Sequence, residues 1–515
     1  MDSNARPTNA RARRKCPCAL LPAAGLLHCL AVRVLLGCAA GAGTALAAPP
    51  PLLDVLGPDL SELPDQGGDP GPQFGAAVAA DGEWLLVGMP FAKTGTESSG
   101  LVQGGYAGLY RRAGDRWNFQ GSVLGNVPSA SDGARCGHAV GVVHRTDLYL
   151  GLVVGCPNAA GFDGSEPNAG LVLLRSVGDS GGGQIGPRGG TGDRLGASVA
   201  AAQTSDGVAW AAVGAPGGEY VRVYRRAAGA PSWSLDTTLT AGNGAAGDLF
   251  GHSVAVAAAG SSGYPVWIAV GAPQRANLAG TVYVFRHSSI NSTWSQVAQV
   301  SAPSLQFGDL FGASVAYWPS GFNNFDDLLV VGAPNRYAGG DSSLDHRRGT
   351  VSVFRQGVNN GSFTHDGDVA FNVFLCSSSA VTCEDRNQPM AFGTSVAVDA
   401  DGVWIGAPGY DQGDGANVGR VYRAEYGPVF GSEGWWVRSM VSPGALSADC
   451  VHDPNAWGRS DGRFGDAVAA SGALLAVGYP RRGCALEVPP YTTEPRTGQV
   501  RVFGTPVALF ADGFE

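Results

Sequence analysis

Short apolar runs separated by glycine and proline recur along the chain and predict many short β-strands. Some runs begin with an aromatic residue and a glycine, as in Phe250–Ala255, and we expect the first strand of a unit to begin at that aromatic residue; others end in a Gly-x-Pro sequence, as in Leu328–Pro334. A third kind alternates apolar and polar residues, as in Thr281–Phe285, with the period of two that is typical of a strand. No segment shows the periodicity of an amphipathic helix, so the pattern predicts an all-β protein.

The runs form one unit that occurs seven times in the same order. Each unit opens at the residue before a glycine, at Phe74, Cys136, Leu195, Phe250, Phe311, Phe392 and Phe464. A Gly-x-Pro sequence follows in every unit and ends at Pro90, Pro157, Pro216, Pro273, Pro334, Pro408 and Pro480. An alternating run comes next, and the fourth run often opens with tryptophan, at Trp117, Trp233, Trp294 and Trp435. Seven units of four antiparallel strands predict a seven-bladed β-propeller.

These ordered Phe-Gly and Gly-x-Pro pairs resemble the FG-GAP repeats of the integrin alpha-chain β-propeller. Bacterial secreted proteins with FG-GAP-type repeats are similar as well, through phrases such as Gly247–Val254. The resemblance covers residues 74–504, and it implies a propeller used for adhesion or recognition. The tail, residues 505–515, ends in Asp-Gly-Phe-Glu and resembles the terminus of other exported bacterial proteins.

The seventh unit lacks a fourth strand of its own, because only twelve residues follow Gln499–Phe503 and none of them is tryptophan. Residues 48–73 precede the first unit and contain one unassigned apolar run, Leu52–Leu56. We expect this run to pair as the outer strand of the last blade and to cover its open edge.

Residues 1–47 have the layout of a secretory signal peptide. A basic segment, Arg11–Lys15, precedes an apolar stretch, and Ala45–Ala47 has the small-x-small form of a cleavage site. Leu35–Cys38 also resembles a lipoprotein box, so acylation of Cys38 is an alternative. No later segment holds 18 consecutive apolar residues, so we expect no membrane span after cleavage and a secreted, periplasmic or cell-surface location.

Charge and cysteine content extend this interpretation. The chain has a net charge of −9, and removal of residues 1–47, with six basic residues and one acidic residue, would make it −14. Such a charge argues against a nucleic-acid partner.

Six cysteines follow residue 47 and indicate disulfides, for which 15 pairings exist. We favour the pairs Cys136–Cys156, Cys376–Cys383 and Cys450–Cys484 over a metal site, because no Cys-x-x-Cys pair and no nearby histidine cluster follows residue 47.

Candidate metal sites are weak. The resemblance to integrins implies calcium loops of the form Asp-x-Asp-x-Asp-Gly, but Asp399–Gly402, Asn323–Asp327 and the pair Asp81 and Glu83 offer too few carboxylates. A second acid recurs before the first strand, at Asp132, Asp193, Asp248, Asp309 and Asp461. We interpret these acids as acceptors of downstream backbone N–H groups in turns, and we expect no cofactor and no metal.

No catalytic residue is assigned. The sequence Gly178–Gly182 matches Gly-x-Ser-x-Gly, but a glycine-rich loop replaces the strand and helix that a nucleophile elbow needs. The serines of the Gly-x-Ser-Val runs and the histidines His138 and His252 repeat within first strands, so we interpret them as framework and packed residues. A carboxylate pair for glycoside hydrolysis has no fixed spacing, so a hydrolase stays an alternative.

The loops after each Gly-x-Pro sequence vary most between units, and binding residues tend to lie on loops held by a rigid frame. In a propeller these loops gather on one face. The candidate ligand-binding residues there are Asn158, Phe162, Asp163, Arg275, Asn277, Arg336, Tyr337, Tyr410, Asp411, Arg481 and Arg482. We therefore expect an exported binding or adhesion protein that recognises an extracellular protein or a polysaccharide. A propeller-based glycan hydrolase or lyase and a structural cell-envelope protein are the alternatives.

Overall fold

The structure is a computed structural model of the chain. It describes residues 50–57, 72–93, 104–123, 133–145, 149–160, 166–177, 183–258, 265–288, 291–319, 327–336, 348–357, 362–370, 390–400, 402–410, 418–429, 432–443, 462–472, 474–480 and 498–504. The chain divides into two compact units, 1–46 and 47–515, and every described residue belongs to the second. The predicted leader and tail lie outside these ranges. Within the ranges, no helix has the length and apolar character that crossing a membrane requires.

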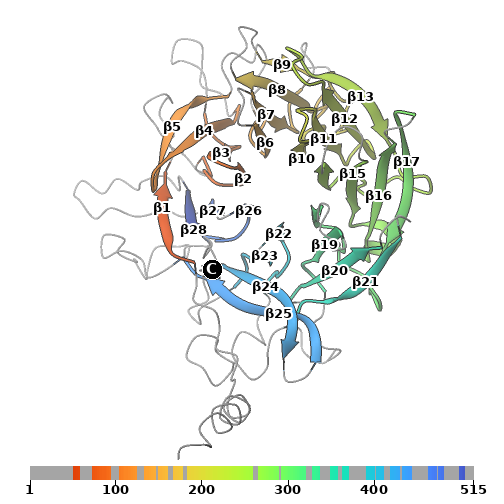
Figure 1. Ribbon diagram of the computed structural model, residues 1–515. Coiled ribbons are helices and arrows are strands. Elements are labelled where there is room, and N and C mark those ends of the chain that lie inside the picture. Colours follow the sequence, from red (N-terminus) through yellow and green to blue (C-terminus); the bar gives the residue numbers. More distant parts are fainter. Residues whose placement is uncertain are drawn as a thin grey trace, which may run out of the picture. The chain divides into compact units, whose positions relative to one another are not determined.

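The second unit is a seven-bladed β-propeller of four-stranded antiparallel sheets, as the repeats predicted (Figure 1). In the first four blades the strands are β2 (Ala77–Asp81), β3 (Trp84–Met89), β4 (Tyr106–Ala113), β5 (Arg116–Ser122); β6 (Ala139–Arg145), β7 (Tyr149–Cys156), β8 (Leu171–Val177), β9 (Gln184–Ile185); β10 (Ser198–Gln203), β11 (Ala209–Ala215), β12 (Tyr220–Arg226), β13 (Ser234–Leu239); and β14 (Ser253–Ala258), β15 (Val266–Ala272), β16 (Thr281–Ser288), β17 (Thr293–Val300). A short helical turn, α2 (Arg275–Leu278), connects β15 to β16.

The last three blades follow the same plan. Their strands are β18 (Ser314–Trp318), β19 (Asp327–Ala333), β20 (Thr350–Gln356), β21 (Phe363–Asp368); β22 (Ser395–Asp399), β23 (Gly402–Ala407), β24 (Arg420–Val429), β25 (Ser432–Val441); and β26 (Val468–Ser471), β27 (Leu474–Tyr479), β28 (Gln499–Gly504), β1 (Leu52–Leu56). The first strand of each blade contacts the first strands of both neighbouring blades, and this ring of contacts closes from β26 to β2. First strands therefore surround the centre of the ring.

The Phe-Gly motif forms a tight turn, so the first strand begins after it rather than at the aromatic residue as the sequence predicted. Leu249 has a φ of 57° and Gly251 a φ of 91°, and the His252 N–H donates to the Leu249 carbonyl oxygen at 3.0 Å. A glycine with positive φ at the third position is the geometry of a type II turn. The residue before the motif has a positive φ in all seven blades, at Gln73, Arg135, Arg194, Leu249, Leu310, Ala391 and Arg463.

Neighbouring blades interlock through two glycines. A Cβ atom on Gly214, which belongs to the Gly-x-Pro sequence of the third blade, would lie 2.0 Å from the carbonyl oxygen of Gly251 in the next blade. The equivalent separation is 1.9–2.1 Å in all seven blades, including the one between Gly478 of the last blade and Gly75 of the first. Ser198 donates from Oγ to the same Gly251 carbonyl at 2.7 Å, which confirms the expected framework role of this repeated serine.

The aromatic residue of the motif belongs to the core of its own blade. Phe250 is fully buried and packs edge to face on Tyr283, with the ring centroids 5.5 Å apart. Edge-to-face contacts of this kind add about 0.5–1.5 kcal/mol to the burial of the rings themselves. Phe311 packs on Phe354 and Phe392 on Tyr422 in the same way, so the repeat encodes a repeated aromatic pair.

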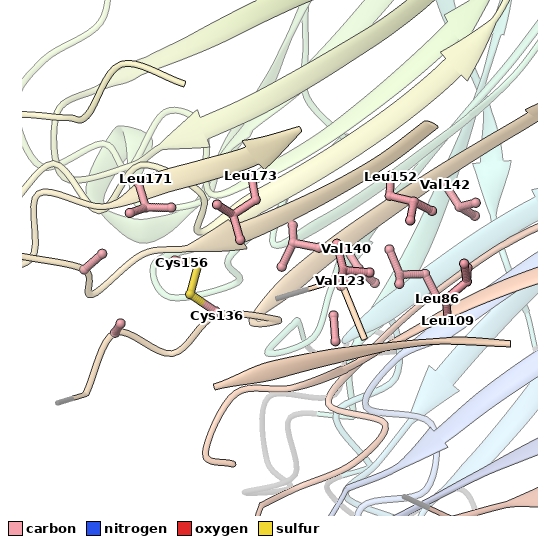
Figure 2. Packing of buried hydrophobic residues seen from close by; sticks show 14 of the residues in the cluster. Leu86, Leu109, Val123, Cys136, Val140, Val142, Leu152, Cys156, Leu171 and Leu173 are labelled. Atoms are coloured by element: carbon pink, nitrogen blue, oxygen red, sulfur yellow. A yellow bond between two sulfur atoms is a disulfide. The ribbon is translucent and has the colours of Figure 1, made fainter. Parts of the chain in front are cut away.

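In the second blade a disulfide takes the place of this aromatic contact. Cys136 and Cys156 are bonded, as the sequence predicted, and both are buried among Val140, Leu171 and neighbouring apolar residues (Figure 2). The other four cysteines, Cys376, Cys383, Cys450 and Cys484, lie outside the described residues. Their pairing stays a prediction.

The ring closes through the N-terminal strand. β1 pairs antiparallel with β28 and completes the seventh blade, as predicted for Leu52–Leu56. Leu56 is buried, while Leu52 and Val55 are exposed. Asp54 accepts a hydrogen bond on Oδ2 from the Trp117 N–H of β5, at 3.0 Å, so β1 also joins the last blade to the first.

Candidate binding face

The propeller has one face on which two sets of loops meet. Because strands alternate in direction within a blade, the loops between second and third strands lie at the same end as the loops that lead into the next blade's first strand. We call this end the loop face. Backbone hydrogen bonds join the two sets within a blade, for example from Asn158 N–H to Ala134 O at 3.2 Å and from Gln274 N–H to Asp248 O at 3.1 Å. The loops of this face thus brace one another.

Five of the eleven predicted binding residues are described, namely Asn158, Arg275, Asn277, Arg336 and Tyr410. All five lie in loops after second strands, at the predicted face. The other six, Phe162, Asp163, Tyr337, Asp411, Arg481 and Arg482, lie outside the described residues. The five differ in how far they are available to a partner molecule.

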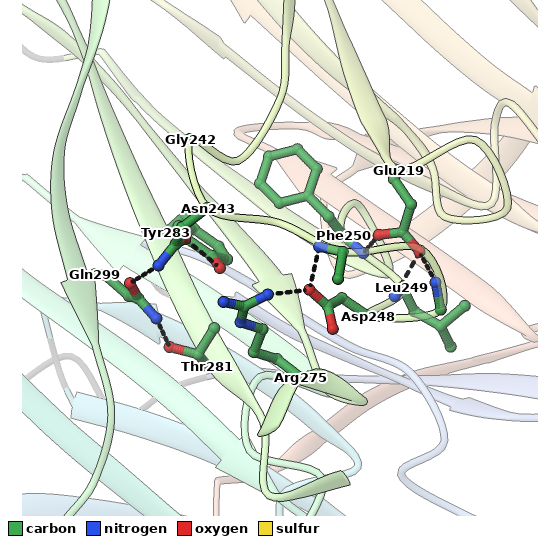
Figure 3. A network of polar contacts seen from close by, with 12 residues as sticks. Glu219, Gly242, Asn243, Asp248, Leu249, Phe250, Arg275, Thr281, Tyr283 and Gln299 are labelled. Atoms are coloured by element: carbon green, nitrogen blue, oxygen red, sulfur yellow. Dashed lines mark hydrogen bonds and ion pairs between the residues drawn. The ribbon is translucent and has the colours of Figure 1, made fainter. Parts of the chain in front are cut away.

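Arg275 is held by a carboxylate of its own blade (Figure 3). Its Nη1 lies 2.6 Å from Asp248 Oδ2, and this hydrogen bond raises the pKa of the guanidinium. Asp248 Oδ2 also accepts the Ala245 N–H at 2.7 Å. Arg275 therefore fixes the loop after β15 to the loop before β14, and its charge is largely satisfied within the protein.

The guanidinium of Arg336 has more hydrogen-bond partners within the protein than that of Arg275. It donates from Nη1 to Asp368 Oδ2 at 3.0 Å and from Nη2 to the Pro303 carbonyl oxygen at 2.7 Å, and its side chain is 11% exposed. Burial alone would raise the pKa of Asp368, but hydrogen bonds from His365 and Ser352 and the charge of Arg336 lower it. This arrangement gives Arg336 a framework role.

The remaining three described candidates have different surroundings. Tyr410 is buried, and the Arg420 guanidinium carbon lies 3.6 Å from the centre of its ring. Asn158 is half-buried in the braced loop. Asn277 is exposed and lies within three successive non-glycine residues of left-handed conformation, with φ values of 55° at Ala276, 59° at Asn277 and 64° at Leu278. Of the five, Asn277 is the most accessible to a partner.

The repeated acids accept backbone N–H groups in turns, as the sequence indicated. However, the N–H groups that donate to them lie earlier in the chain than the acid, not later. Asp193, Asp248 and Asp309 each accept on Oδ2 from the N–H three residues earlier in the chain, at 2.7–2.8 Å, rather than from one further on. The backbone N–H of each acid returns a hydrogen bond to that same earlier residue. The acid thus closes the turn before Phe-Gly from both sides. Asp132 and Asp461 lie outside the described residues.

Sequence reasoning missed Glu219. This residue precedes β12, where the other blades have glycine, and it has a φ of 58°. Its carboxylate accepts three backbone N–H groups of the next turn, from Gly247 and Leu249 at 3.0 Å on Oε1 and from Phe250 at 2.7 Å on Oε2 (Figure 3). At the next blade boundary the corresponding Phe311 N–H donates to a backbone carbonyl, that of Ala279. The glutamate after a short Pro-Gly-Gly loop was the signal that could have been noticed.

We expect Glu219→Ala to destabilise the fold by about 2–3 kcal/mol, because three N–H groups lose a charged acceptor. Chemical denaturation followed by tryptophan fluorescence measures this change. Glu219→Gln keeps one acceptor oxygen and should lose less. An unchanged midpoint for the alanine variant would contradict the assigned role.

The opposite face carries the hairpins for which calcium was considered. Asp399 is buried and accepts from Trp404 Nε1 at 3.3 Å, and the hairpin pairs Asp399 directly with Gly402. Asp81 accepts the His144 N–H at 2.7 Å, and burial raises the pKa of this carboxyl. Glu83 forms an ion pair with Arg111. Asn323–Asp326 lies outside the described residues, and among those described no group of residues could hold a metal ion.

Comparisons with known proteins bear on the repeat. A family model for the FG-GAP repeat matches residues 233–285, which cover β13, β14, β15 and the first part of β16. A search of curated proteins gives no match. Among solved structures, a point mutant of NanB sialidase from Streptococcus pneumoniae has 8% sequence identity and a TM-score of 0.43, covering 72% of this chain and 69% of that one. The chain is thus a seven-bladed β-propeller that carries an FG-GAP repeat, consistent with an FG-GAP β-propeller protein.

Proposed function

We propose that this propeller is an exported binding protein that recognises a protein or a glycan through its loop face. The supporting observation is a patch where two loops of that face meet. The Leu310 and Phe311 N–H groups donate to the Leu278 and Ala279 carbonyl oxygens at 3.0 Å, which ties the loop before β18 to the loop that contains α2. The two loops therefore present their side chains together.

This patch combines exposure with backbone strain. Phe307 is 68% exposed, more than any other large apolar side chain that the structure describes. Asn277, on the adjoining loop, is exposed within the left-handed segment Ala276–Leu278. Strained non-glycine backbone persists only where its surroundings impose it, and it is concentrated at functional sites. An exposed aromatic side chain and an exposed amide on adjoining loops suit contact with a protein surface or a sugar ring.

The expected result is a specific hit when the labelled protein is applied to an array of glycans and of envelope and matrix proteins. Phe307→Ala and Asn277→Ala should each weaken that hit about tenfold or more, since hot-spot side chains contribute about 2 kcal/mol or more. Leu235→Ala, at an exposed apolar residue of outer strand β13, is the matched control and should bind normally.

Three outcomes would contradict the proposal. If a well-folded sample bound no target on the array, a structural envelope role would be favoured. Cleavage of a bound glycan, detected by mass spectrometry, would favour the hydrolase or lyase. A hit that both loop variants leave unchanged would place the binding surface elsewhere.

Two further expectations are tested alongside. Loss of binding in chelator would overturn the expectation that no metal is needed. Export rests on residues 1–47 and is tested by N-terminal sequencing of the processed protein.

A further inference from the structure

The last residue of each Phe-Gly turn lies beside a first strand, and the first strands surround the centre of the ring. These residues are Ala76, His138, Ala197, His252, Ala313, Thr394 and Asp466. Each lies one or two residues before a first strand, yet each is partly or fully exposed to solvent, whereas the motif residues before it are buried. First strands contact one another around the ring, so the residues at this position lie at the rim of the space that these strands enclose. His138 is half-buried and His252 is exposed, so the structure places His252 outside the core, in contrast to the sequence interpretation.

Four cationic or ionisable side chains occupy three successive turns at this level. His138 and Arg135 are the last and first residues of the second blade's turn, Arg194 is the first residue of the third blade's turn, and His252 is the last of the fourth's. The interlocking glycines hold these turns side by side, because Gly155 packs on Gly196 and Gly214 on Gly251.

The groups act on one another electrostatically. Burial by the surrounding protein lowers the pKa of His138 to about 4, with Arg194, Arg135 and His252 contributing in the same direction. Burial and Arg194 also lower the pKa of His252. The His252 side chain is exposed to solvent, but enough protein lies around it to lower its pKa, as expected for a residue at the rim of an open ring. No carboxylate is among the groups that shift either histidine.

These four side chains retain unused hydrogen-bond donors. Within the described residues, the rings of His138 and His252 and the guanidinium of Arg194 have no hydrogen-bond partner, and Arg135 only lies over the Phe91 ring, at 4.8 Å from its centroid. Across the ring the equivalent arginine is neutralised, because Arg463 donates to both oxygens of Asp466 at 2.7 Å. Among the described turns, arginines without a carboxylate partner therefore occur in the second and third blades alone, in a chain whose net charge is −9.

We propose that Arg135, His138, Arg194 and His252 form a binding site for a carboxylate of an acidic sugar at the centre of the loop face. Arginine offers a planar pair of donors that matches a carboxylate, and a neutral imidazole adds one N–H donor without further charge. A singly charged planar anion suits two arginines and two neutral histidines better than a phosphate dianion does. The site deepens the proposed function, since it would select a partner glycan that carries uronic acid units.

Isothermal titration calorimetry of the whole protein with glucuronate tests the site directly. We expect glucuronate to bind and glucose, its neutral counterpart, not to bind. Arg194→Gln should weaken glucuronate about tenfold or more, since it removes a charged donor pair. The matched control is Arg111→Gln, which removes the same charge from the opposite face and should leave affinity unchanged. A thermal melt of Arg194→Gln should match the parent protein, because the side chain is exposed.

The pH dependence separates binding from a purely structural role. A bound anion stabilises protonated histidine and so raises the pKa of His138 from its value of about 4 in the empty site. Binding should therefore take up protons, and affinity should rise as the pH falls from 7.5 to 5.5. The charged and titratable groups that act on His138 are Arg135, Arg194 and His252, which all lower its pKa, so a bound anion that compensates their charge shifts this pKa upward. The double variant His138→Asn/His252→Asn should bind with no pH dependence.

Several results would overturn the site. These are no glucuronate binding at either pH, equal losses in Arg194→Gln and Arg111→Gln, or inorganic phosphate binding more tightly than glucuronate. Failure here is distinct from failure of the proposed function. An array hit on a neutral glycan that Arg194→Gln leaves unchanged would keep the loop face and reject the anion site. Glucuronate binding without any hit on the array would support the anion site and contradict the proposed binding of a macromolecule.

Discussion

Gly214→Ala should abolish folding or lower stability by about 3 kcal/mol or more, since overpacking a tight core costs about 1–3 kcal/mol and here the obstacle is backbone that cannot rotate away. The added Cβ would lie 2.0 Å from the Gly251 carbonyl oxygen and 2.3 Å from Ser198 Oγ, so two blades would have to move apart. The hydrogen bond from Ser198 to the same carbonyl would be lost as well. Soluble yield and the denaturation midpoint measure the effect.

Gly57→Ala is the control for this prediction. Within the described part of the chain, and apart from its two chain neighbours, no heavy atom lies within 4 Å of the position that its Cβ would take, and the glycine has no positive φ, so the substitution should be nearly neutral. Because each blade repeats the contact, Gly271→Ala, Gly332→Ala and Gly406→Ala should resemble Gly214→Ala. A stable, fully folded Gly214→Ala would show that the blades are not held at the spacing described here.

The same glycines explain why the sequence was informative about the fold. A seven-fold repeat of Phe-Gly and Gly-x-Pro is required by local geometry, since a turn needs positive φ at one glycine and the neighbouring blade leaves no room for a side chain at the other. Closure by Leu52–Leu56 could be predicted as well, because the last unit lacked a fourth strand. The start of the first strand was misplaced, since the turn was included in it.

The site was less predictable, because residue type does not reveal its partners. Arg336 was singled out as an unusual loop residue, but Asp368 and the Pro303 carbonyl engage its guanidinium. His252 was interpreted as packed but is exposed, since its position in the repeat alone does not distinguish a buried side chain from an exposed one. Phe307 was not among the candidates, because its exposure depends on a loop whose path the repeat does not specify.

Deletion of Leu52–Leu56 should destabilise the propeller by about 5 kcal/mol and lower its melting temperature sharply. Leu56 is buried against the first blade's core, and burial of a leucine contributes about 1.5–3 kcal/mol. The hydrogen bond from Trp117 N–H to Asp54 joins the first and last blades, and a bond to a charged group contributes about 1.5–3 kcal/mol. The deletion also leaves β28 as an unpaired edge, which invites association with other chains. Calorimetry and light scattering measure both effects.

Rescue in trans distinguishes a missing strand from a general defect. A synthetic peptide of residues 50–57 should restore the melting temperature of the deleted protein in a concentration-dependent way, because it can pair with β28 from Val500 to Phe503. Asp54→Ala within the peptide should weaken the rescue, since the bond to Trp117 would be missing. Val55→Ser should rescue normally, because Val55 is 43% exposed. If the deletion left the melting temperature unchanged, contacts between neighbouring first strands, such as β26 with β2, would suffice to close the ring without β1.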